Sequence, residues 1–158
     1  MNSNPLTQTR DTKYNIALRI IAGAPLLIFG VMHLSGAAPM LPLVEAAELP
    51  APALTAIAAP IVQILAGLLL ILGALTRLGA VLGVIVMLGG LITNFLIPND
   101  QWPIPVDTAP NTEPMILTPL AILVIILSAV LLFVGGGKWS VDRKVEGPSD
   151  QPGAANET

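Results

Sequence analysis

The sequence predicts an all-α integral membrane protein, an antiparallel four-helix transmembrane bundle with its N- and C-termini in the cytoplasm. Three observations favour this fold. The chain of 158 residues is 54% hydrophobic and only 11% charged, whereas a soluble domain carries about 25% charged residues. Four apolar runs approach the ~20 residues that cross a bilayer core as a helix. The basic residues are confined to some of the connections between these runs, which gives the runs an orientation.

The four apolar runs lie between a polar N-terminal segment and a polar tail. Because a backbone in lipid must satisfy its own hydrogen bonds, each run is expected to be helical. Pro25 and Pro119 fall inside runs, and each can kink its helix. Residues 1–13 form the polar segment, and residues 146–158 are expected to be disordered because they are small and polar. The transmembrane domain then covers the residues between them, 14–145. Its spans are expected at about 14–34, 58–75, 78–97 and 115–134.

Orientation follows from the positions of the lysines and arginines. They precede or open the first run, lie between the second and third runs, or follow the fourth: Arg10, Lys13, Arg19, Arg77, Lys138, Arg143 and Lys144. Connections 35–57 and 98–114 carry acidic residues and none that is basic. The positive-inside rule then places both termini in the cytoplasm, as in a multi-pass protein of the bacterial inner membrane. We interpret Arg19 as a snorkelling anchor, Arg77 as a topology anchor and hairpin cap, and Trp139 as a marker of the inner interface.

The connections differ in length and composition. Little more than Thr76 and Arg77 joins the second run to the third, which predicts a tight helical hairpin. In the first outer connection, residues 40–49 (MLPLVEAAEL) are typical of a short amphipathic helix at the interface. The second, residues 98–114, contains five prolines and predicts an ordered, non-helical cap.

The N-terminus has a second interpretation. Basic residues, an apolar stretch and the small residues 35–38 (SGAA) also resemble a signal peptide with its cleavage site. We favour a retained span, because the polar lead-in is long and the apolar run has nearly full spanning length.

The polar side chains within the runs are expected to lie in one layer, in the outer part of the membrane. At about 1.5 Å per helical residue, His33 and Gln63 each lie about 21 Å outward from the arginine at the inner end of the same run. Asn94 lies about 26 Å and Thr118 about 24 Å from the inner ends of their runs. We therefore expect a ligand pocket formed by His33, Gln63, Asn94 and Thr118.

The same residues share helix faces with small residues. At about 100° per residue, the stripes that contain His33, Gln63 and Asn94 are rich in glycine and alanine. Their members are Gly23, Gly30, Gly67, Ala74, Gly79, Gly83 and Gly90. Small residues mark close helix–helix contact in membranes, so these polar side chains are expected to face the bundle interior.

A structural role is the alternative for each polar residue. Gln63 and Asn94 can serve only as interhelical glue, and the hydroxyls of Thr93, Thr118 and Ser128 can bond their own helix carbonyls. His33 differs because an ionisable residue inside a membrane is costly and therefore suggests a function.

Composition excludes several chemistries. The chain has no cysteine, so disulfides, thiolate metal sites and thiol relays are excluded, and one histidine cannot give bis-histidine haem ligation within a chain. No metal motif or covalently bound cofactor is expected, no carboxylate lies in the spans as a proton or sodium pump would need, and no basic surface suggests nucleic acid. A small pocket with one imidazole, two amides and apolar walls suits an amphipathic carbonyl ligand such as a quinone.

Three stretches resemble the DoxX family of small four-helix bacterial membrane proteins. They are RIIAGAPLLIFGVMHL at 19–34, GLLLILGALTRLGAVLGVIVML at 67–88 and GGGKWSVDR at 135–143. The family takes its name from a subunit of an archaeal terminal quinol oxidase, and other members are described as membrane parts of oxidoreductase or oxidative-stress complexes. Members often carry glutamate at the position of Gln63 and a histidine near Asn94, whereas a polar or basic residue at the position of His33 is retained here. The resemblance therefore implies a binding or scaffolding role more than proton or redox chemistry.

The leading hypothesis is a DoxX-like membrane subunit or accessory factor of a quinone-linked oxidoreductase system, not necessarily catalytic itself. A non-enzymatic scaffold or assembly factor, whose glycine faces pack against partner helices, is the second hypothesis. A carrier of a small lipophilic molecule is the third. Partner membrane or redox proteins are expected, and a homo-oligomer is compatible with the same glycine faces.

Overall fold

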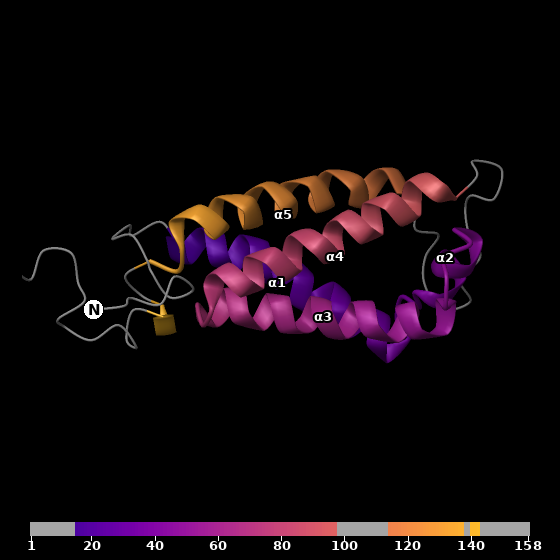
Figure 1. The fold of residues 1–158 in the computed structure, drawn as a ribbon, viewed down its shortest axis with the longest axis horizontal. Helices are drawn as coiled ribbons and strands as arrows, with labels where there is room; N and C mark the ends of the chain where they lie inside the picture. The colour runs from indigo at the N-terminus through magenta and orange to yellow at the C-terminus, as the bar shows by residue number, and fades with distance from the viewer. Residues whose placement is uncertain (1–14, 98–113, 138–139, 143–158) are drawn as a thin grey trace, which may run out of the picture.

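The computed structural model describes residues 15–97, 114–137 and 140–142, with side chains described from Thr118 onward in the second range. These residues form four long helices and one short one (Figure 1). They are α1 (Asn15–Ser35), α2 (Leu41–Ala46), α3 (Pro52–Leu72), α4 (Thr76–Leu96) and α5 (Pro114–Val134).

The long helices form a closed ring of neighbours. Helix α1 packs on α3, α3 on α4, α4 on α5, and α5 on α1. The Asn15 side chain, at the start of α1, donates a hydrogen bond to the Gly135 carbonyl just after α5. Arg19 bonds the last carbonyls of α3. The start of α1 thus lies beside the ends of α3 and α5, while α2 covers the opposite end of α3 and α4 (Figure 1).

The described part of the chain is all-helical, as expected for a helical membrane protein. Helices α1, α3 and α4 are each long and apolar enough to cross a membrane, and the described stretch Thr118–Val134 of α5 is a shorter apolar helix. Many large apolar side chains of these helices are exposed, such as Ile28, Ile85 and Phe95. An apolar outer surface of this kind suits contact with lipid.

Helix α3 differs most from the expected spans. It begins at Pro52 instead of 58, because proline is favoured in a first helical turn and the alanine-rich residues after it propagate a helix without strong hydropathy. It ends at Leu72 instead of 75, where Gly73 adopts a left-handed conformation at φ 66°. The hairpin turn is therefore Gly73–Leu75, and Thr76 and Arg77 form the first turn of α4.

Glycines set the distance between α1 and α3. A Cβ added to Gly67 would lie 2.7 Å from the Leu27 nitrogen and 2.8 Å from the Gly23 carbonyl oxygen, and one added to Gly30 would lie 3.0 Å from the Pro60 carbonyl oxygen. Only glycine permits such an approach of two backbones. On one side of this contact the buried core contains the large side chains of Leu26, Leu70, Val124 and Leu131.

Several expectations lie outside the described residues. These are the polar segment 1–13, the cap formed by most of 98–114, the interfacial role of Trp139 and the tail 146–158. The short helix expected within 40–49 corresponds to α2.

Candidate functional site

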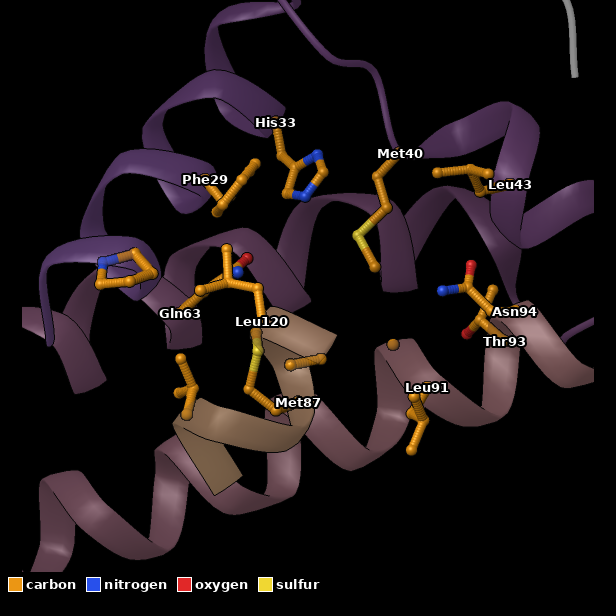
Figure 2. Close-up of a pocket in the computed structure, with 14 residues that line it drawn as sticks. Phe29, His33, Met40, Leu43, Gln63, Met87, Leu91, Thr93, Asn94 and Leu120 are labelled. Carbon is orange, nitrogen blue, oxygen red and sulfur yellow. The ribbon is translucent and has the colours of Figure 1, made fainter. Parts of the chain in front are cut away.

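A partly open cavity of about 120 Å³ lies among the helices, and we call it the bundle cavity. All five helices or their connections contribute to its wall, which is mostly apolar (Figure 2). The lining residues are Pro25, Phe29, His33, Met40, Leu43, Gln63, Met87, Gly90, Leu91, Thr93, Asn94, Leu120, Ala121 and Val124.

Three of the four expected site residues line this cavity. His33 comes from α1, Gln63 from α3 and Asn94 from α4, so the structure brings together side chains that lie far apart in the sequence. The fourth, Thr118, is not among the lining residues, and α5 contributes Leu120, Ala121 and Val124 instead. Thr118 precedes Leu120 by two residues, which rotates its side chain about 200° around the helix. The expected depth did not determine which face of α5 is turned to the cavity.

His33 is held by its neighbours on α1 and by the segment after it. Its Nδ1 lies 2.6 Å from the Ala38 carbonyl oxygen. The chain can fold back in this way because Gly36 adopts φ +80°, and the Ala38 amide then bonds the Met32 carbonyl. Phe29 lies one turn earlier on α1, and the centroid of its ring is 6.4 Å from the centroid of the imidazole. Figure 2 shows the ring extending from α1 toward the space between Gln63, Met40 and Leu120.

Unlike His33, the side-chain amides of Gln63 and Asn94 form no hydrogen bond with the described residues. Gln63 is only 5% exposed and Asn94 is half-buried. Among the residues that the structure describes, neither amide has a hydrogen-bond partner, and His33 bonds to neither of them. The expectation that these residues serve as interhelical glue therefore does not describe Gln63 and Asn94 here.

Threonine and glycine complete the wall on α4. The Thr93 hydroxyl donates a hydrogen bond of 2.9 Å to the Gly89 carbonyl one turn earlier, as the structural alternative expected. A Cβ added to Gly90 would meet no atom within 4 Å, although Gly90 lines the cavity. Unlike Gly67, Gly90 therefore does not serve close helix packing, and its missing side chain leaves room inside the cavity.

A second polar cluster lies at the other end of the bundle, and sequence reasoning missed it. We call it the end clamp, and it consists of Asn15, Arg19, Thr76, Ser140 and Asp142. Arg19 is 2% exposed, so its interpretation as a snorkelling side chain is wrong. Its guanidinium donates hydrogen bonds to the carbonyls of Leu70 at 2.9 Å, Ile71 at 2.7 Å and Gly136 at 3.1 Å. A cation at the C-terminal carbonyls of α3 is electrostatically favourable.

Asp142 performs the complementary task at the start of α4. Its carboxylate accepts hydrogen bonds from the backbone amides of Leu75, at 2.6 Å, and Thr76, at 2.9 Å, and from the Thr76 hydroxyl, at 2.7 Å. Its own amide donates to the Gly73 carbonyl at 2.9 Å. The carboxylate also attracts the buried Arg19 guanidinium. The end clamp therefore caps both ends of the α3–α4 turn with charges from distant parts of the chain. The anchoring role of Arg77, which is half-buried, stays a prediction.

Within the described residues, no group of three or more histidine or acidic side chains is placed to hold a metal ion.

The family model described as DoxX matches residues 15–96, just over half of the chain, and covers α1 to α4. No curated protein and no solved structure matches the sequence. The matched region contains all three helices, α1, α3 and α4, whose polar side chains line the bundle cavity.

Proposed function

Because the chain belongs to the DoxX family of membrane proteins, we propose that it is an accessory membrane subunit of a quinone-linked oxidoreductase system. In this proposal the bundle cavity binds the ring of a quinone-type ligand. The protein spans the bacterial inner membrane four times, with both termini in the cytoplasm, and the cavity lies toward the outer leaflet.

The unpartnered amides of Gln63 and Asn94 carry the proposal. An amide offers both a donor and an acceptor, so one that lines a cavity without a protein partner can bind a ligand of either kind. The remaining wall is apolar, including Phe29, Met87 and Leu120. Apolar walls with a few polar groups that fix orientation are typical of small-molecule sites.

The size of the cavity limits which part of a ligand can enter. Its volume of about 120 Å³ is near the ~150 Å³ of an engineered cavity that holds benzene, and below the ~300–1,000 Å³ of pockets for drug-sized ligands. We infer that one six-membered ring enters, while an alkyl tail leaves through the open side into lipid. A bound quinone ring supplies two-electron, two-proton redox chemistry. The residues of the chain bind the ring, orient it and exclude water.

The position of Gly90 allows a sharp test of ligand binding. Replacing it by leucine fills the cavity from the wall, while the same change at Gly89 adds a side chain at an exposed position outside the cavity lining, where an added Cβ would meet no atom within 4 Å. The two variants therefore match in helix position and chemistry. We expect a decyl-substituted benzoquinone or its hydroquinone to raise the melting temperature of the purified wild-type protein and of Gly89→Leu, but not that of Gly90→Leu.

A smaller substitution at the same position controls for misfolding of the leucine variant. Gly90→Ala adds one methyl group to the cavity and is expected to weaken binding without abolishing it. If neither quinone nor hydroquinone stabilises the wild-type protein, or if Gly90→Leu responds as Gly89→Leu does, the bundle cavity is not the binding site. Co-purification of partner proteins with no ligand effect would then favour a scaffold.

A further inference from the structure

Two hydrogen bonds on the wall of the bundle cavity determine whether its polar side chains offer a ligand hydrogen-bond donors or acceptors. A backbone carbonyl can only accept, so the 2.6 Å contact with the Ala38 oxygen places the imidazole proton of His33 on Nδ1. A neutral imidazole carries a single N–H, and its other nitrogen, Nε2, is then an acceptor. Figure 2 shows the ring of His33 directed into the cavity.

The Thr93 side chain also offers a hydrogen-bond acceptor to a ligand. Its hydroxyl has one proton, which it donates to the Gly89 carbonyl at 2.9 Å. The oxygen retains its lone pairs, which accept. Two of the polar side chains in the wall therefore have committed their donors to backbone carbonyls and present acceptors to a ligand.

Gln63 and Asn94 do not restrict the ligand to a hydrogen-bond donor or to an acceptor. Each amide can donate or accept, and no hydrogen bond within the described part of the chain holds it in one orientation. They can adapt to a ligand, whereas His33 and Thr93 cannot while the backbone contacts are intact. A carbonyl oxygen beside Nε2 would place two acceptors against each other, whereas a hydroxyl would donate to it.

We propose that the bundle cavity selects ring ligands that carry a hydroxyl group, a phenol or hydroquinone, over analogues that carry only acceptors. His33 acts as the specificity-determining residue through its bare Nε2. This inference rests on the proposed function, because it concerns the ligand of the same cavity. It adds that the reduced, hydroxyl-bearing form binds more tightly than the oxidised form.

Three probes with one skeleton separate polarity from shape. They are a decyl-substituted hydroquinone, the corresponding benzoquinone and the hydroquinone dimethyl ether, which has no donor and no redox chemistry. Affinities are measured by titration of the detergent-solubilised full-length protein without oxygen. We expect the hydroquinone to bind about tenfold more tightly than either analogue, which corresponds to one well-formed hydrogen bond.

The variant His33→Asn tests the assignment to Nε2. Asparagine can place an amide N–H near the position of Nδ1, toward Ala38, but it has no group at the position of Nε2. We expect this variant to keep its melting temperature within a few degrees and to lose the preference for hydroquinone. Thr93→Val, which keeps shape but removes the acceptor, is expected to reduce the preference partially.

The single histidine of the chain gives a direct second readout. In a protein labelled with ¹⁵N-histidine, one spectrum reports His33 alone, and we expect a proton on Nδ1, a bare Nε2, and a shift of Nε2 when hydroquinone binds. A proton on Nε2, or benzoquinone or ether binding as tightly as hydroquinone, overturns the inference alone. Binding of none of the three probes overturns the proposed function and this inference with it.

Discussion

At the scale of single residues, the chain uses its few polar side chains at the two ends of the bundle for opposite purposes. In the end clamp every described hydrogen bond of Asp142 is short and directed, and the carboxylate is buried at 3% exposure. In the bundle cavity the amides of Gln63 and Asn94 have no partner among the described residues. Satisfied polar groups stabilise a fold, whereas amides that line a cavity without a protein partner are available to a ligand.

The Asp142 carboxylate provides a prediction at this scale. In Asp142→Asn, one carboxylate oxygen becomes an amide nitrogen, which places a donor against the backbone amide of Leu75 or of Thr76. We expect the free energy of unfolding in detergent micelles to fall by about 2 kcal/mol, the range for a helix cap with charge-assisted hydrogen bonds.

Glu45→Gln is the matched control for that prediction. Glu45 is exposed on α2, so the same loss of charge removes no buried hydrogen bond and is expected to change stability by less than about 0.5 kcal/mol. Equal effects of the two substitutions would mean that Asp142 contributes only its charge and does not cap α4.

At the scale of helices, glycine separates into two classes according to what a side chain would meet. Gly67 and Gly23 lie at a backbone-to-backbone contact between α1 and α3, whereas Gly89 and Gly90 meet no atom within 4 Å. The regular spacing of small residues in the sequence suggested one continuous packing stripe. In the structure the stripe on α4 packs at Gly79 and Gly83 and opens into the bundle cavity at Gly90.

Alanine substitutions distinguish these two classes of glycine. In Gly67→Ala the new Cβ would lie 2.7 Å from the Leu27 nitrogen, so α1 and α3 must separate, and we expect a loss of about 1–3 kcal/mol in the free energy of unfolding. In Gly89→Ala nothing obstructs the methyl group, and we expect a gain of about 0.5–1 kcal/mol from helix propensity. Equal changes would indicate that α1 and α3 are not in close contact in the membrane.

At the scale of the whole molecule, helical geometry made much of the structure predictable. Rise and rotation per residue brought His33, Gln63 and Asn94 to one cavity, because both quantities hold within any straight helix. The face of α5 was not predictable, since it depends on packing against its neighbours, and Thr118 is not among the residues that line the cavity. The end clamp was not predictable either. Arg19 and Asp142 are 123 positions apart in the sequence, and their meeting depends on where α3 ends and the chain after α5 turns.

The orientation in the membrane gives a further prediction at this scale. The chain has no cysteine, so single cysteines introduced at the exposed residues Glu45 and Val141 can be labelled without background. We expect a membrane-impermeant maleimide to label Glu45→Cys in intact spheroplasts, and Val141→Cys only after permeabilisation. The reverse pattern would invert the proposed topology.

The most direct test of ligand binding in the bundle cavity is photolabelling with an azido-substituted benzoquinone, followed by peptide mass spectrometry. We predict adducts on cavity residues such as Met87, Leu91 and Leu120. Excess unreactive hydroquinone should prevent these adducts, and they should be lost in Gly90→Leu but retained in Gly89→Leu. Adducts only on outward-facing side chains such as Ile85 and Phe95, unaffected by the competitor, would contradict the proposal that this protein holds a quinone-type ring within its bundle.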